Sequence, residues 1–301
     1  MQTGLASLAS PVFYKGCLSV MKVDLHCHSD LSDGQLSVEA LIHRAADNQV
    51  SLLAITDHDV ACLSPADFDL AVSRGINLIP GVEFSSQWSG VGIHVVGLAI
   101  DIEAPGFQEA LKIQRENRVE RAREIARRLE KKGLVGVYEG ATNLAGKSQI
   151  GRPHFARYLY QSGQVKSEAQ AFKKYLGAGK VGDIKACWPP LERVVGWIRE
   201  AGGVAVLAHP AHYKISLSKL RCLCDDFRQV GGRAIEVVSG NQSSDRAASI
   251  ARLCQEFCFY GSCGSDFHGP ASQWSDVGKM SFFPEGCNPI WKLWGDHKHH
   301  I

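Results

Sequence analysis

Seven short apolar runs recur along the chain, and most of them contain or precede a histidine or a carboxylate. The runs are KVDLH, LLAIT, NLIPGVEF, IHVVGL, VAVLAH, AIEVV and FYGSCGSD. Continuous apolar runs of this length are typical of parallel strands that are buried on both faces. Helical patterns such as SVEALIHRAADN separate several of them, so we expect strands and helices to alternate in a β/α barrel. Such barrels carry their chemistry at the carboxyl ends of the strands.

One segment interrupts this alternation. Residues 105–132 predict a long charged helix whose apolar positions lie on one face, and the stretches GRPHFARYL and AFKKYLGAGKVGD that follow contain no strand pattern. We therefore expect residues 101–188 to form a helical insertion that caps the barrel. The barrel itself is then discontinuous and comprises residues 21–100 and 189–290.

Composition limits the classes of protein to consider. The net charge is +2, from 33 basic and 31 acidic residues, so no overall basic field favours binding to duplex nucleic acid. No stretch approaches the roughly 20 apolar residues of a membrane span, and residues 1–20, which lack the features of a secretory signal, are expected to be a disordered extension. The ten cysteines match no paired framework. We expect reduced thiols and a cytoplasmic location, with no membrane association and no evident protein partner.

The residues near the strand ends are of the types that bind metal ions. In an extended segment residues i and i+2 point the same way, so His26 and His28 can bind one cation together, as can Asp266 and His268. Imidazoles mixed with carboxylates suit manganese, iron or zinc. Chance placement is a poor explanation because unpaired buried polar groups are costly and the coincidence would have to recur at six or seven strand ends. Each remaining histidine, taken singly, is an ordinary core or surface group.

The motifs HCHSDLSDG, ITDHD, PGVEFS, HVVGL, AHP and GSDFH occur in this order over residues 24–268. Together they resemble the PHP (polymerase and histidinol phosphatase) family of metal-dependent phosphoesterases. The insertion, with GRPHFARYL and FKKYLGAGKVG, is similar to a bacterial subgroup of nucleoside 3′,5′-bisphosphate phosphatases that also act as 5′ to 3′ exoribonucleases. The resemblance implies an α/β fold, a distorted (β/α)7 barrel, with two or three divalent ions. Mn²⁺ is the expected metal, with Fe²⁺ or Zn²⁺ as alternatives.

The resemblance also implies nine metal ligands, all present in this chain: His26, His28, Asp33, His58, Glu83, His94, His209, Asp266 and His268. Glu83 is the expected bridging carboxylate and Asp266 the second bridge. Asp57, beside the ligand His58, is expected to support the site or cap a strand. Cys27 points away from the two histidines that flank it, so it is not expected to bind metal.

Catalysis is expected to depend on Asp33, His268 and Arg152. Clustered divalent cations lower the pKa of a shared water, which provides a metal-bridged hydroxide near neutral pH. The hydroxide would attack phosphorus in line with the leaving 3′ oxygen. A metal ligand cannot also act as a free acid, so no general acid is assigned.

A phosphate site is predicted at the start of the GRPHFARYL helix. Pro153 suits the first helical position, so Arg152 and His154 lie at an N-terminus where backbone N–H groups and a guanidinium can bind the substrate's 5′ phosphate. Lys180 on its glycine-rich loop is a further candidate ligand, with Lys185 as a possible addition. A solvated face is expected for Arg157, Lys173 and Lys174, and Trp188 and Phe267 are candidates for base stacking.

These expectations point to nucleoside 3′,5′-bisphosphates and 5′-phosphorylated RNA as substrates, because cleavage of the same bond explains both activities. Two alternatives stay open. One is a phosphatase for a small metabolite such as histidinol phosphate, and the other is a non-catalytic metal-binding module.

Overall fold

The computed structural model describes residues 21–270 and 275–295. The N-terminal extension expected at residues 1–20 and the His-rich tail at residues 296–301 lie outside the described residues. None of the described helices is long and apolar enough to cross a membrane.

Seven strands form one sheet in the order of the sequence. They are β1 (Val23–Asp24), β2 (Leu52–Ile55), β3 (Asn77–Trp88), β4 (Val91–Leu98), β5 (Val204–Leu207), β6 (Ala234–Ser239) and β7 (Tyr260–Gly264). The first and last strands meet, since the backbone N–H of Leu25 donates to the carbonyl of Cys263 at 3.0 Å and Cys27 forms a bridge with Phe267. This closure confirms the predicted seven-stranded barrel.

The fourth strand runs in the opposite direction to its neighbours, so the prediction that all seven runs are parallel is wrong for IHVVGL. The turn at Ser89 and Gly90 has positive φ at both residues, the geometry of a two-residue hairpin. The register pairs Ser85 with His94. Because β4 enters from the end where β3 leaves, His94 lies near the catalytic end of the barrel although it comes early in its strand.

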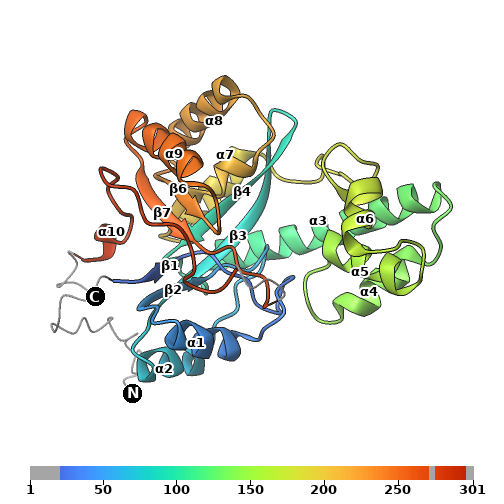
Figure 1. The fold of residues 1–301 in the computed structure, drawn as a ribbon, viewed down its shortest axis with the longest axis horizontal. Helices are drawn as coiled ribbons and strands as arrows, with labels where there is room; N and C mark the ends of the chain where they lie inside the picture. Colours follow the sequence, from blue (N-terminus) through green and yellow to red (C-terminus); the bar gives the residue numbers. More distant parts are fainter. Residues whose placement is uncertain (1–20, 271–274, 296–301) are drawn as a thin grey trace, which may run out of the picture.

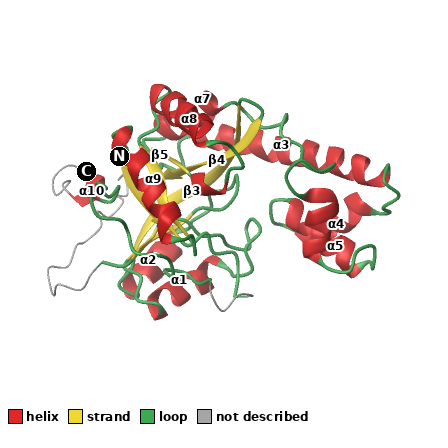
Figure 2. Ribbon diagram, turned by 45° about the horizontal axis from the view of Figure 1, so that its top comes forward, coloured by secondary structure: helices red, strands yellow, loops and turns green. Residues whose placement is uncertain are grey.

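Helices cover the barrel strands (Figures 1 and 2). They are α1 (Val38–Asp47), α2 (Pro65–Ser73), α7 (Leu191–Glu200), α8 (Leu217–Gln229) and α9 (Ser244–Glu256), with a 3₁₀ turn, η2 (Pro210–His212), and the short α10 (Lys292–Gly295). Each of the five longer helices begins after a serine or proline, and in α1 and α8 the serine hydroxyl accepts a backbone N–H of the first turn.

The expected helical insertion projects from the barrel as a separate lobe (Figure 1). It comprises α3 (Pro105–Glu130), α4 (Val137–Ala145), α5 (Arg152–Gln161), α6 (Glu168–Ala171) and the π-helix η1 (Phe172–Leu176). The first turns of α3 bury Phe107 and Leu111 in the barrel core, whereas Ile125 and Leu129 belong to a second core within the lobe. One continuous helix therefore connects the two cores.

Candidate active site

Glu83 is buried at the centre of a cluster of imidazoles. Its Oε1 lies 2.9 Å from His94 Nδ1 and 2.8 Å from His209 Nε2. Its Oε2 lies 2.7 Å from His58 Nδ1, in an orientation that forms no hydrogen bond. These contacts bring together the middle of β3, the first half of β4 and the segments that follow β2 and β5.

The loops after β1 and β7 complete the cluster. Asp266 Oδ1 lies 3.3 Å from His28 Nε2 and 3.6 Å from His26 Nε2, while Asp33 Oδ1 lies 3.3 Å from His268 Nε2. Ligand atoms within 4.8 Å of one another define three groups, each able to hold one ion: His28, Asp33, His58 and His268; His26, His28 and Asp266; and His58, Glu83 and His94. The ninth predicted ligand, His209, joins them through Glu83.

The donor atoms of this cluster fit divalent cations. Seven buried side-chain atoms of these residues have no hydrogen-bond partner: His26 Nε2, both ring nitrogens of His28, Asp33 Oδ1, His58 Nδ1, Glu83 Oε2 and His209 Nδ1. Buried polar atoms are normally paired because leaving them unpaired is costly. A mixed set of imidazole nitrogens and carboxylate oxygens suits Mn²⁺, Fe²⁺ or Zn²⁺.

Burial and neighbouring charges shift the pKa values of the cluster residues in different directions. Burial alone would raise the pKa of Glu83, but the neighbouring His58, His94 and His26 hold it well below its usual value. Burial lowers the pKa of His28 to about 3. Burial also opposes protonation of His268, yet its contact with Asp33 and the charge of Asp266 raise its pKa to about 10.

Glu236 on β6 is a site residue that the sequence analysis missed. Its Oε1 lies 3.1 Å from His26 Nδ1, and its Oε2 accepts the backbone N–H of His209 at 2.5 Å. His209 has a φ of 28°, an uncommon backbone conformation that this bond supports. The sequence does contain a signal for Glu236, because a glutamate in the middle of the buried run AIEVV needs a polar partner.

The loop that carries Asp33 is held in place by Asp57. The Asp57 carboxylate accepts the backbone N–H of Ser29 at 2.8 Å and the hydroxyls of Ser29 and Ser32, each at 2.5 Å. It therefore has a supporting position, as expected. Gly34 closes the loop, and a Cβ there would lie 2.3 Å from the carbonyl oxygen of His28.

Cys27 is fully buried between the two histidines in sequence, and its Sγ lies 3.4 Å from the carbonyl oxygen of Ala54. It packs in the hydrophobic core. The expectation that it points away from the metal ligands agrees with this position.

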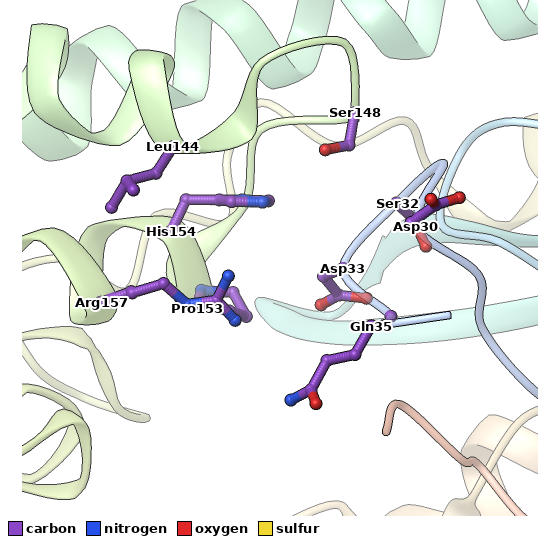
Figure 3. Close-up of a pocket in the computed structure, with 10 residues that line it drawn as sticks. Asp30, Ser32, Asp33, Gln35, Leu144, Ser148, Pro153, His154 and Arg157 are labelled. Atoms are coloured by element: carbon purple, nitrogen blue, oxygen red, sulfur yellow. The ribbon is translucent and has the colours of Figure 1, made fainter. Parts of the chain in front are cut away.

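A cavity of about 520 Å³ separates the Asp33 loop from the insertion (Figure 3). His154 and Arg157 extend into this gap from α5, while Asp33 and Gln35 face them from the barrel loop. The volume lies within the range of small-molecule sites. Arg157, for which a solvated face was expected, therefore lines a cavity that adjoins the metal-ligand cluster.

Two of the predicted phosphate ligands, Arg152 and Lys185, are not among the described residues that line this cavity. Arg152 begins α5, one residue before the expected start, and its Nη1 donates to the Leu176 carbonyl at 3.2 Å and lies 3.7 Å from Asp183 Oδ1. Burial lowers its pKa, and the charge of Arg118 lowers it further. Lys185 Nζ lies 3.1 Å from Asp183 Oδ2.

His154 is buried, and its Nδ1 accepts the backbone N–H of Gly151 at 3.0 Å. When the ring is neutral, this bond leaves the hydrogen on Nε2, which can donate to an anion. Lys180 is exposed and has no side-chain hydrogen bond or ion pair within the described part of the chain. Of the three predicted phosphate ligands Arg152, His154 and Lys180, the structure thus brings His154 alone to the cavity among the described lining residues.

The two candidates for base stacking are buried. The ring of Trp188 is covered by the guanidinium groups of Arg118 and Arg121, at 5.5 and 5.0 Å from its centroid, and Phe267 is fully buried in the core. Neither ring is available to a nucleobase.

Comparison with known proteins places this geometry in a family. The sequence model of the PHP domain family matches residues 24–183 of this chain. The "5'-3' exoribonuclease Rnm" of Escherichia coli (strain K12) is 43% identical over 90% of this chain and 93% of its own length. The "3',5'-nucleoside bisphosphate phosphatase" of Chromobacterium violaceum is 42% identical over 90% of this chain and 95% of its own length.

A solved structure of an amidohydrolase from Chromobacterium violaceum, which contains bound sulfate and no metal, superimposes with a TM-score of 0.84 at 41% identity. The alignment covers 91% of this chain and 96% of that one. The barrel, the cluster of imidazoles and carboxylates, and these similarities lead to one conclusion: the chain belongs to the PHP domain family.

Proposed function

We propose that this protein is a metal-dependent hydrolase that removes the 3′ phosphate of nucleoside 3′,5′-bisphosphates and releases 5′ nucleotides from 5′-phosphorylated RNA. The observation that carries the proposal is the position of Asp33, which belongs to a metal-ligand group and also lines the cavity facing α5. Relatives at 43% and 42% identity that are named as an exoribonuclease and a bisphosphate phosphatase support it.

The nine ligands would hold two or three divalent ions, with Mn²⁺ as the proposed metal. When bound, such ions lower the pKa of a water so that a hydroxide is present near neutral pH, and they neutralise charge on the phosphoryl oxygens. Glu83 contacts three imidazoles and orients those of His94 and His209, while Asp57 fixes the loop of Asp33.

The insertion would hold the 5′ phosphate of the substrate. Arg157 lines the cavity and supplies positive charge, and His154 supplies an N–H donor beside it. Arg152, at the start of α5, precedes the lining residue Pro153 and would add a second positive charge. A nucleotide whose 5′ phosphate lies there places its 3′ phosphorus beside Asp33 and the metal-ligand cluster.

Hydrolysis then breaks the bond between phosphorus and the 3′ oxygen. A hydroxyl adds to phosphorus, and the 3′ oxygen leaves and takes a proton from solvent. The group on the far side of the phosphorus is either hydrogen or the next nucleotide. One geometry therefore gives inorganic phosphate from a bisphosphate and a 5′ nucleotide from RNA.

The proposed location is the cytoplasm, supported by nine described cysteines that are all free. Histidinol phosphate carries no second phosphate for the α5 cavity, and a non-catalytic module would need no such cavity. Both alternatives are therefore poorer explanations of a cavity lined by His154 and Arg157.

The test is release of inorganic phosphate from adenosine 3′,5′-bisphosphate, the 3′-monophosphate, the 5′-monophosphate and histidinol phosphate, with added Mn²⁺ and with a chelator. We expect preference for the bisphosphate and loss of activity on chelation. Selective hydrolysis of histidinol phosphate, or no activity in the metal-loaded protein, would contradict the proposal.

Arg152→Ala tests the 5′ phosphate site directly. A charged hydrogen bond contributes about 1.5–3 kcal/mol, so the preference for the bisphosphate over the 3′-monophosphate should fall at least about tenfold. Retained turnover of the 3′-monophosphate shows that the fold is intact. The control is Arg123→Ala, an exposed arginine on α3 that should leave the preference unchanged.

A further inference from the structure

A second cavity, of about 590 Å³, opens beside the metal-ligand cluster. It lies between η2, the end of β6 and the start of α9, and Asp266 forms part of its wall. No described residue lines both cavities. His268 lies between them, because its Nε2 is 3.3 Å from Asp33 and its Nδ1 is 3.8 Å from Asp266. The metal-ligand cluster therefore separates two cavities.

The wall of this second cavity is suited to an anion. Arg246, in the first turn of α9, lines the cavity and has no ion pair with any described carboxylate. The N-cap residue Ser243 also lines the cavity, and its side chain makes no capping hydrogen bond. The N–H groups of the first turn of this 13-residue helix thus have no side-chain cap. Asp245, the acidic residue of that turn, does not line the cavity within the described part of the chain.

An independent observation points to a ligand. Ser239, the last residue of β6, is 1% exposed and lines the cavity, yet its Oγ has no hydrogen-bond partner. A buried hydroxyl without a partner is costly and is rare in folded proteins. Outside the metal ligands, it is the one such side-chain atom among the described residues. A ligand with an acceptor oxygen at this position would satisfy it.

We propose that this cavity binds the phosphodiester that follows the cleaved bond in an RNA substrate, with Arg246, Ser239 and the start of α9 as its ligands. The inference rests on the proposed function. The 5′ phosphate of the first nucleotide lies at α5, the scissile phosphorus lies at the metal ligands, and the next phosphate lies at α9. The RNA chain then crosses the barrel mouth from the insertion to α9.

The cavity would contact the RNA backbone and not its bases. Its described lining residues include no tryptophan, tyrosine or phenylalanine on which a base could stack, and the imidazole of His212, which does line it, is stacked on His209 with 5.5 Å between ring centroids. Contacts to phosphate position a strand without selecting its sequence. The site is therefore expected to act equally on RNA of any sequence, as a 5′ exonuclease requires.

The kinetic test compares two 5′-phosphorylated diadenylates, one with a 3′ phosphate and the other with a 3′ hydroxyl, by their initial rates of 5′-adenylate release. The wild type should show a KM about tenfold lower for the 3′-phosphorylated form, and Arg246→Ala should remove this difference. Arg252→Ala, an exposed arginine on the same helix, should retain it. Equal KM values in the wild type, or an unchanged difference in Arg246→Ala, would overturn the proposal.

A binding test measures the affinity for RNA without hydrolysis. Binding of a fluorescent 5′-phosphorylated RNA hexamer to the protein in chelator is measured by anisotropy at several salt concentrations. For single strands the slope of log K against log salt changes by about 0.7 for each phosphate contact, so the slope should become shallower by this amount in Arg246→Ala. If the bisphosphate is hydrolysed but the slope is unchanged, the proposed function stands and this inference fails. If no substrate is hydrolysed but the slope changes, the proposed function fails, whereas the contact of Arg246 with an RNA phosphate stands.

Ser239→Ala provides a second variant with a distinct signature. Removal of an unpaired buried hydroxyl should leave the thermal unfolding midpoint unchanged or raise it, whereas RNA binding should weaken about fivefold. A lower midpoint with unchanged binding would show that the hydroxyl serves the fold and would overturn its role here.

Discussion

His26 lies between two carboxylates, with its Nδ1 3.1 Å from Glu236 Oε1 and its Nε2 3.4 Å from Glu83 Oε1. A histidine that binds a metal through one ring nitrogen commonly donates from the other to a carboxylate, which fixes its orientation and increases its basicity. Glu236 has this position, and it also accepts the backbone N–H of His209. One carboxylate therefore orients two predicted ligands.

Glu236→Gln should weaken metal binding about 10- to 100-fold, the usual effect of losing such a partner. The glutamine is nearly isosteric, so the fold should persist. The affinity for Mn²⁺ is measured by competition with a fluorescent chelator, with Glu200→Gln, an exposed residue on α7, as the control. Equal affinities in the wild type and Glu236→Gln would show that Glu236 does not support the ligands.

Asp33→Asn should reduce turnover on the order of a thousandfold or more, since several kcal/mol of charge stabilisation depend on the metal-ligand set. Asp33 Oδ1 lies near both His268 and His58, so the variant should also bind fewer ions. Metal content and kcat are measured on the same preparation, with the exposed Asp47→Asn as the matched control. Full metal content together with full activity would exclude Asp33 from the site.

Metal binding should release protons at neutral pH. Contact with Asp33 holds the pKa of His268 at about 10 in the metal-free protein, so this ring is protonated at pH 7 and must lose its proton to bind a metal. His28, with a pKa of about 3, is already neutral and contributes no proton. Affinity should therefore rise as the pH is raised from 6 to 9.

Titration calorimetry in buffers with different ionisation enthalpies counts the released protons. The His268→Gln variant should release about one proton fewer than the wild type. If both proteins release the same number of protons, His268 does not lose a proton when the metal binds.

The sequence was sufficient to predict the barrel and the metal-ligand cluster because most of the ligands follow a strand end, where barrel geometry brings distant residues together, although Glu83 and His94 lie within β3 and β4. The direction of β4 was missed because an apolar run looks the same in parallel and antiparallel strands, and only the turn at Ser89 and Gly90 distinguishes them. Glu236 was missed because its role depends on a contact with His26, 210 residues away in the sequence.

The burial of two arginines of α3 is a second feature that the sequence pattern did not predict. Alternating charges on a long helix usually indicate a solvated surface, yet Arg118 is 6% exposed and Arg121 is 7% exposed. Their burial depends on how the insertion lies against the barrel, which no local pattern encodes.

Arg118 joins the insertion helix to the barrel through Asp59, with Nη2 2.6 Å from Oδ2 and both side chains buried. Breaking a buried pair by removing one partner costs about 3–5 kcal/mol, because the remaining charge has no counterion. Asp59 also accepts from Gln114 and from the backbone N–H of Ser85, so Arg118→Ala should cost about 3 kcal/mol, the lower end of that range.

The free energy of unfolding is measured by urea denaturation of Arg118→Ala and of the control Arg115→Ala, an exposed arginine one turn away on the same helix. The control should change stability by no more than about 0.5 kcal/mol. Because α3 also carries the lobe that contains Arg152, Arg118→Ala should raise the KM for the bisphosphate more than it lowers kcat. Equal stability of the two variants would show that the contact between Arg118 and Asp59 does not hold the insertion against the barrel, and the position of α5 over the metal-ligand cluster would then need another source.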